Sequence, residues 1–188
     1  MRVFVAVELP GKIREALAAL VGELKQEIPG PRWVRPQGIH LTLRFLGEVS
    51  QTDLERLSDQ LARRVPQTPG PFTVSLEGLG VFPEKGRPRV LWVGLLEPGG
   101  ALMKLQSIVE GAVEAAALPG MKKEDRPYRP HLTLARFAEG RPSPGLARAL
   151  SAREGHGWGG FEVSSVCLVQ SLLKPGGAEY RVLKEQRL

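Results

Sequence analysis

The sequence predicts an α+β fold built from two similar lobes. The tetrapeptide His-Leu-Thr-Leu occurs at 40–43 and again at 131–134, 91 residues apart in a chain of 188 residues. In each half, a helix and a loop precede the tetrapeptide strand, and another helix follows it. Hydrophobic residues make up 42% of the chain, which is ample for a packed interior. We therefore expect one two-lobed domain over 1–188, with antiparallel sheet and one tetrapeptide strand in each lobe.

Hydrophobic periodicity and turn residues define the elements of the first half. The predicted order is a strand over 3–9, a helix over 12–28, a strand over 39–46 and a helix over 52–65. Pro-Gly at 10–11 ends the first strand, and Pro-Gly-Pro at 29–31 ends the first helix. Ser50 and Thr52 are both candidate N-caps of the second helix.

The second half is predicted from the same signals. Its expected elements are strands over 72–82 and 89–96, a helix over 101–117, a strand that begins at Pro130, a short helix over 145–153 and strands over 161–173 and 179–184. A turn-rich segment (83–88) joins the first two strands, and a turn at 174–177 joins the last two. We expect the glycine-rich segment 155–160 to be a loop.

Charge and cysteine content narrow the class of protein. Lys and Arg number 26 against 20 Asp and Glu, so the formal net charge is +6. A basic surface favours a polyanion such as RNA, although modest positive charge also occurs on proteins that bind none. No apolar stretch is long enough to predict a membrane span. The single cysteine, Cys167, cannot form an internal disulfide, which indicates a reduced cytoplasmic location.

The two tetrapeptides predict a site with paired histidines. Side chains two apart on a strand point to the same face, so each copy presents His and Thr together. Histidine exchanges protons near neutral pH, so His40 and His131 can serve as general acid and general base. The hydroxyls of Thr42 and Thr133 can donate hydrogen bonds to phosphate oxygens. Phosphodiester hydrolysis needs these roles, and this arrangement requires no metal.

Flanking residues add further candidates. Strand alternation places Arg44 on the face of His40, as a phosphate ligand. It places Arg129, a candidate for RNA binding, on the face of His131 if the strand is already extended there. The same alternation directs Arg136 away from His131, which predicts a structural role for Arg136. The aromatic residues that could stack on bases are Trp33, Tyr128 and Tyr180.

Other motifs do not support a different chemistry. His156 has no Cys or His at metal-ligand spacing, and Cys167 lies in an apolar strand where we expect it to be inert. The sequence has no phosphate-binding P-loop and no Gly-x-Ser-x-Gly nucleophile elbow. We therefore expect no metal and no cofactor.

These motifs resemble the 2H phosphoesterase superfamily, which is marked by paired His-x-Thr-x motifs with apolar x. Several segments also resemble its RNA 2′,3′-cyclic phosphodiesterase branch, historically called 2′-5′ RNA ligase. They are RVFVA at 2–6, HLTLRFLG at 40–47, PHLTLAR at 130–136, and Ser171-Leu172 followed by Gly177-Ala178-x-Tyr180. The one departure we note is Tyr128, where the branch often has Phe.

The resemblance implies a bilobal α+β fold in which both motifs face a central cleft. It implies hydrolysis of a 2′,3′-cyclic phosphate at an RNA end to a 2′-phosphate, and a weak, reversible 2′-5′ joining of RNA halves, with tRNA halves as one candidate. By family orientation, His40 is the acid that protonates the ribose O3′ and His131 is the base. No metal or nucleotide cofactor is implied, and we expect a monomer.

Two other classes of function stay open from the sequence. A different 2H activity would act on 2′-5′ oligoadenylates or on ADP-ribose cyclic phosphate. A non-catalytic RNA-binding protein would use its basic surface and release no product.

Overall fold

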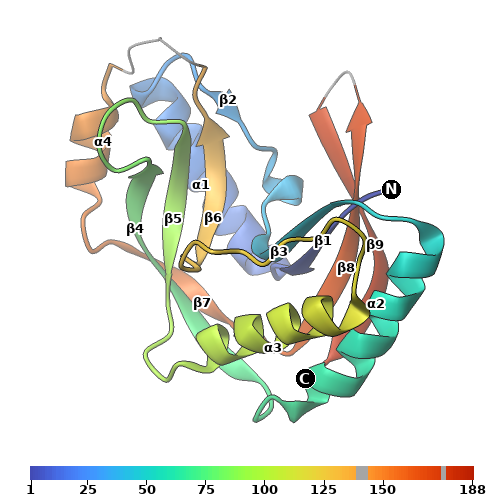
Figure 1. Cartoon of the computed structure of the whole chain (residues 1–188). Coiled ribbons are helices and arrows are strands. Elements are labelled where there is room, and N and C mark those ends of the chain that lie inside the picture. Colours follow the sequence, from blue (N-terminus) through green and yellow to red (C-terminus); the bar gives the residue numbers. More distant parts are fainter. Residues whose placement is uncertain (139–143, 175–176) are drawn as a thin grey trace.

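A computed structural model describes residues 1–138, 144–174 and 177–188 of the chain (Figure 1). Among these residues the strands are β1 (Arg2–Val7), β2 (Arg32–Trp33), β3 (Leu41–Glu48), β4 (Phe72–Phe82), β5 (Val90–Leu96), β6 (His131–Arg136), β7 (Gly157–Val163), β8 (Ser165–Lys174) and β9 (Gly177–Arg187). The α-helices are α1 (Gly11–Glu27), α2 (Gln51–Arg64), α3 (Ala101–Ala116) and α4 (Leu146–Ala152), and two short 3₁₀ turns, η1 (Pro36–Gly38) and η2 (Val65–Gln67), precede β3 and β4. The predicted α+β class is confirmed.

The strands form one curled antiparallel sheet, and the strand order on one side of its centre corresponds to the order on the other side. Neighbouring strands follow the sequence β7-β4-β5-β6-β3-β1-β8-β9, and the short β2 pairs with the end of β6. The two motif strands, β6 and β3, lie next to each other at the centre. In one half the motif strand β6 pairs with β5, the strand that precedes helix α3. In the other half the motif strand β3 pairs with β1, the strand that precedes helix α1. The two halves of the sheet therefore have matching topology around the motif strands.

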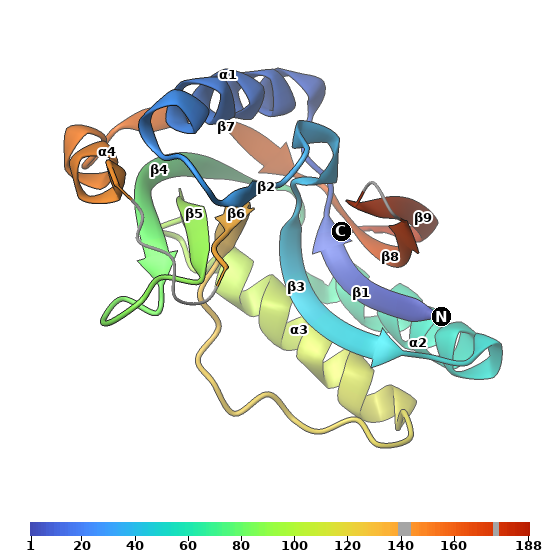
Figure 2. The same cartoon turned by 90° about the horizontal axis from the view of Figure 1, so that it is seen from above.

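The helices cover the sheet in an exchanged manner (Figure 2). Helix α1 follows β1 in the chain, yet it contacts β7 and α4 in the other half of the sheet. Helix α3 follows β5, yet it packs against β3 and against α2. The half that contains β7 is thus covered by α1, which follows a strand of the other half, β1. The half that contains β3 is covered by α3, which follows β5 of the first half.

Local sequence explains why the predicted helices form. The apolar side chains of α1 that lie three and four residues apart are buried, namely Ile13, Leu17, Leu20, Val21 and Leu24. Ser50 is the N-cap of α2, because its hydroxyl accepts a hydrogen bond from the backbone N–H of Asp53 at 3.1 Å. Of the two candidate caps, the structure selects Ser50.

Two expectations about the C-terminal third are wrong. The segment expected as a loop over 155–160 contributes most of β7, and the strand expected over 161–173 is two strands that separate at Ser164. The backbone of glycine forms the hydrogen bonds of a strand ladder as the backbone of other residues does. At Gly160 a Cβ would lie 2.8 Å from the carbonyl oxygen of Val74. The close approach of β4 explains the glycine there. Residues 175 and 176 of the expected turn lie outside the described residues.

The core lies mainly between the sheet and its helices. Leu41, Leu43, Leu132 and Leu134 of the two tetrapeptides are all buried in it. In the described part of the chain, no helix is both long enough and apolar enough to cross a membrane.

Candidate active site

The four polar side chains of the tetrapeptides share one face of the central strands. Leu41 pairs with Leu132 across β3 and β6. Continued in the antiparallel direction, this register sets His40 beside Thr133 and Thr42 beside His131. All four polar side chains are half-buried, whereas the leucines between them are buried on the opposite face. We call this polar side of the sheet the site face.

Both imidazoles are held by the same local hydrogen bond. His40 Nδ1 lies 2.9 Å from the carbonyl oxygen of Gly38, and His131 Nδ1 lies 2.7 Å from that of Arg129. A carbonyl only accepts, so Nδ1 of each ring carries the proton and donates it. In the neutral rings Nε2 is therefore the unprotonated nitrogen and can accept a proton, and only a ring protonated on both nitrogens can deliver one from Nε2.

Aromatic rings fix the orientation of His40. Its ring stacks on Phe4, with centroids 4.5 Å apart, and meets the edge of Tyr180 at 5.0 Å. Tyr180 in turn lies against Gly38, where a Cβ would be only 3.0 Å from its ring. Glycine at this position thus leaves room for Tyr180 beside the residue that holds His40 Nδ1.

A different set of rings surrounds His131. Phe82 meets it edge to face at 5.0 Å, and the Trp92 ring lies 6.4 Å away. The guanidinium of Arg129 lies 5.0 Å from the Phe82 centroid, and Arg129 also pairs with Glu84. Each motif histidine is therefore packed by aromatic residues from neighbouring strands.

The surroundings favour the neutral form of both histidines. Burial lowers the pKa of His40 to about 4, against the raising effect of its bond to Gly38, and the positive charges of Arg14 and Arg136 lower it further. Burial also lowers the pKa of His131, and Arg136 and Arg129 add to this effect. Since Arg136 acts on both rings, its charge lies near both.

A β-bulge follows the threonine in each motif strand. Thr42 pairs with Ala6 but Arg44 pairs with Val5, so Leu43 is an extra residue in β3. Thr133 pairs with Trp92 but Ala135 pairs with Leu91, so Leu134 is an extra residue in β6. A bulge reverses the faces of the residues beyond it.

The expected orientation of Arg44 is wrong because of this bulge. Arg44 is 8% exposed and lies on the core side, where its Nε is 3.5 Å from Glu110 of α3. Its Nη1 is 3.6 Å from Glu124, and its Nη2 donates to the carbonyl of Lys122. Arg44 ties β3 to α3 and to the loop that follows it, and it does not share a face with His40.

Arg136, which alternation directed away from the site, lies on the site face. It is exposed at the end of β6, two residues beyond the bulge. The matching position in β3 is Phe45, which is 65% exposed and packs on Phe4. The sequence contains a signal for the bulge in β3. Its buried leucines lie at 41, 43 and 46, and this spacing departs from the two-residue alternation of a strand after Leu43.

The other candidates have different positions. Tyr180 lies beside His40, as described above. Tyr128 is largely buried, and its hydroxyl donates to the carbonyl oxygen of Thr42 at 2.9 Å; burial raises its pKa. Trp33 pairs with the buried Ala135 and packs against the core. Of the three aromatic candidates, the structure places Tyr180 at a motif histidine.

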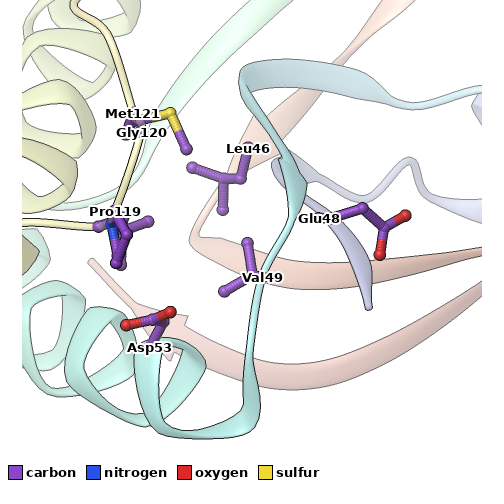
Figure 3. A pocket seen from close by; sticks show the side chains of 8 residues that line it. Leu46, Glu48, Val49, Asp53, Pro119, Gly120 and Met121 are labelled. Carbon is purple, nitrogen blue, oxygen red and sulfur yellow. The ribbon is translucent and has the colours of Figure 1, made fainter.

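A cavity of about 190 Å³ is lined by residues other than the polar motif side chains, and Figure 3 shows the side chains that line it. It opens between the end of β3, the start of α2 and the segment after α3. Its lining residues are Leu46, Glu48, Val49, Asp53, Leu118, Pro119, Gly120 and Met121. None of the four polar motif residues lines it, so the candidate site is the site face rather than this cavity. Within the described ranges, no group of three or more His, Cys, Asp or Glu residues is placed to hold a metal ion.

Comparison with known proteins gives a consistent result. The profile of the family described as LigT-like phosphoesterase matches residues 7–92 and 96–180. Proteins named RNA 2′,3′-cyclic phosphodiesterase from Archaeoglobus fulgidus and Thermus thermophilus are 35% and 38% identical to the chain. Both matches cover 98% of this chain, and they cover 98% and 89% of the relatives.

Solved structures share the fold. A crystal structure of a protein from Thermus thermophilus matches with a TM-score of 0.75 and 34% identity, over 100% of this chain and 98% of that one. Escherichia coli LigT in complex with 3′-AMP matches with a TM-score of 0.76 and 29% identity, over 100% and 97% of the two chains.

Proposed function

The chain belongs to the family of LigT-like phosphoesterases, and we propose that it hydrolyses 2′,3′-cyclic phosphates at RNA ends to 2′-phosphates. The observation that carries this proposal is the pair of motif histidines at the starts of the adjacent central strands, His131 as the first residue of β6 and His40 just before β3, each with Nδ1 bound to a backbone carbonyl. The activity named for the relatives supplies the substrate, and the geometry supplies the two proton-transfer groups.

The proposed reaction is a displacement at phosphorus. His131 accepts a proton from water at Nε2, the water oxygen bonds to phosphorus, and the bond from phosphorus to O3′ breaks. His40 gives a proton to the departing O3′, which becomes a hydroxyl, so the phosphate stays on O2′. Thr42 and Thr133 donate hydrogen bonds to the non-bridging oxygens, where negative charge concentrates. Side chains thus provide every proton transfer, and we propose that the reaction needs no metal.

Substrate binding supplies the condition for the acid role. Burial lowers the pKa of His40 to about 4, which opposes an acid role in the free enzyme. The negative charge of the bound phosphate offsets the field of Arg136 and raises the pKa of the ring that it contacts. The assignment of His40 as acid and His131 as base follows the family orientation.

The same chemistry run with an RNA 5′-hydroxyl in place of water would form a 2′-5′ linkage. The attacking oxygen then belongs to a second RNA end, and O3′ leaves as before. Joining of RNA halves is therefore a second outcome of the same site, with tRNA halves as a candidate substrate. The cytoplasmic location and the monomeric state stay predictions.

Hydrolysis of an oligoribonucleotide with a 2′,3′-cyclic phosphate end, in EDTA, tests the proposal. We expect His40→Ala and His131→Ala each to lower kcat/KM by roughly 10²- to 10⁴-fold, the range for loss of a general acid or base. His156→Ala is the matched control, since this ring lies beside Trp158 at the start of β7, and it should keep the wild-type rate. Near wild-type activity of either motif variant, or loss of activity in EDTA, would refute the mechanism.

A modified substrate in the same assay separates the two roles. Sulfur in place of O3′ makes a leaving group that needs no proton, so it removes the need for the acid. We expect it to restore activity to His40→Ala and not to His131→Ala. The reverse pattern would exchange the two assignments.

A further inference from the structure

Arg14 of α1 connects this helix to the η1 turn that precedes the first motif. Its Nε donates to the carbonyl oxygen of Leu9 at 2.8 Å, and its Nη1 donates to that of Gln37 at 2.9 Å. Its Nη2 donates to the carboxylate of Glu8. The guanidinium thus ties together the segment after β1, the start of α1 and the η1 turn.

The hydrogen bond from Arg14 lies one peptide group away from the contact that orients His40. The carbonyl of Gln37 and the N–H of Gly38 belong to the same planar peptide group. Arg14 holds the oxygen of this group, and a bond of 2.8 Å from the Gly38 N–H to the carbonyl of Arg35 holds its nitrogen. The next carbonyl along the chain is that of Gly38, which accepts the Nδ1 proton of His40. A change in the first peptide group therefore changes the direction of this carbonyl.

The two motif histidines differ in how their carbonyl partners are held. His131 is the first residue of β6 and pairs with Gly94 of β5, so the sheet ladder fixes its backbone. The carbonyl that accepts its proton directly precedes Pro130, whose ring restricts the backbone. His40 comes before β3, and its partner is a glycine, the residue with the greatest backbone freedom. His40 therefore depends on contacts from outside its own strand, and Arg14 provides one.

The charge of Arg14 does not itself favour the acid role of His40. A positive charge lowers the pKa of a nearby imidazole, and Arg14 has this effect on the pKa of His40. The carboxylate of Glu8 lies against the guanidinium and offsets part of that field. Any benefit of Arg14 to the acid therefore comes from the geometry of the turn.

Resting on the proposed function, we propose that Arg14 is a positioning residue for the acid His40. Its fork of N–H groups fixes the Gln37 peptide, and this peptide directs the Gly38 carbonyl toward Nδ1 of His40. Nε2 of the same ring then points toward the departing O3′. Arg14 contacts no reacting group in this role. Its loss impairs proton delivery to O3′ and leaves proton removal by His131 unchanged.

Nitrogen NMR of the histidine rings at neutral pH tests the positioning without turnover. In the wild type we expect His40 and His131 both to carry the proton on Nδ1. In Arg14→Met we expect the His40 signals to shift toward the Nε2–H tautomer, because its carbonyl partner is no longer fixed, while those of His131 stay the same. Arg153→Met is the matched control, since Arg153 makes ion pairs at the other end of α1, and it should leave both rings unchanged.

The substrate with sulfur in place of O3′ supplies the kinetic test, because it needs no acid. On the natural cyclic phosphate we expect Arg14→Met to lower kcat about tenfold, part of the loss expected when the acid is removed, with KM within about twofold. On the sulfur substrate its rate should stay within about twofold of the wild-type rate. A merely structural role would lower both rates by the same factor. Arg153→Met should change neither rate.

A second variant, Arg14→Lys, keeps the charge beside Glu8 and the apolar stem, so it should fold as the wild type does. A single ammonium cannot reproduce the planar fork, so we expect the same two changes in smaller degree. Wild-type behaviour of Arg14→Lys in both measurements would overturn the inference. An unchanged His40 tautomer in Arg14→Met, or equal losses on the two substrates, would do the same.

The NMR measurement also separates this inference from the proposed function. A shifted His40 tautomer in Arg14→Met, in a protein whose wild type hydrolyses no cyclic phosphate, would support the placement of His40 by Arg14. That result would refute the proposed function alone. Hydrolysis by the wild type with an unchanged tautomer in the variant would refute the inference alone.

Discussion

In His40 and His131 a short backbone contact selects the tautomer that the proposed proton transfer requires. In each motif a carbonyl two residues earlier in the chain accepts the Nδ1 proton, at 2.9 Å and 2.7 Å. This bond selects the tautomer and the ring orientation with no help from a carboxylate. Two copies of one local arrangement thus give two equivalent nitrogens, and the different rings around them provide the asymmetry.

The lowered pKa of His40 also makes the stability of the fold depend on pH. The unfolded pKa is about 6.5 and the folded pKa about 4, so the unfolded chain binds more protons between these values. The free energy of unfolding should therefore fall as pH drops from 6.5 toward 4 and should be insensitive to this group above 6.5.

Denaturation in urea at pH 7 and pH 4.5 measures this effect. Between these conditions we expect the wild type to lose roughly 2 kcal/mol more stability than His40→Leu, which does not titrate. His156→Leu should keep the wild-type dependence, because both motif histidines remain. Identical losses in the wild type and in His40→Leu would contradict the assigned pKa shift.

At the scale of the element, the paired bulges decide which residues reach the site. Alternation alone directs Arg44 toward the motif histidines and Arg136 away from them. The extra residues Leu43 and Leu134 reverse both orientations. The result is a β3 strand whose arginine anchors a helix and a β6 strand whose arginine faces the histidines.

Methionine substitutions separate these two roles. Arg44→Met leaves Glu110 without its buried partner, so we expect the free energy of unfolding to fall by about 3 kcal/mol, with kcat/KM changed less than threefold. Combining it with Glu110→Leu should restore most of the lost stability. Arg136→Met should show the opposite pattern, with a loss of kcat/KM of about tenfold or more and little change in stability. A large activity loss in Arg44→Met at unchanged stability would return Arg44 to the site.

At the scale of the whole molecule, the exchanged helices connect the two halves of the sheet. Helix α1 packs on β7 although β1 precedes it, and α3 packs on β3 although β5 precedes it. Neither half can keep its helical cover without the other. We therefore propose that residues 1–188 unfold as one cooperative domain, in which the lobes are parts of a shared core.

Tryptophan fluorescence offers a direct test, because all three tryptophans lie in one half, on β2, β5 and β7. Leu57→Ala creates a cavity under α2, which packs on the other half, and should cost about 2–5 kcal/mol. We expect fluorescence and far-UV circular dichroism to report one shared transition, shifted equally by this variant. A fluorescence transition that Leu57→Ala does not move would show that the halves unfold separately.

Much of the fold could be predicted because its signals are local. The helix over 12–28 and the strands around both tetrapeptides follow from periodicity and from Pro or Gly at their ends, and they are confirmed within one or two residues. The strand over 157–160 could not be predicted in this way. Four glycine-rich positions form it only because β4 supplies hydrogen-bond partners, and that pairing is non-local.

The sequence by itself determined which side chains of the repeated motif lie on the same face. A His and a Thr two residues apart share a face of any strand, since alternation is a local property of extended backbone. Tertiary structure decided what depends on a partner strand: that β3 and β6 are neighbours, and that a bulge against β1 or β5 turns Arg44 inward and Arg136 outward. Bulges and registers arise from hydrogen bonds between segments far apart in the chain, and only the folded sheet brings those segments together.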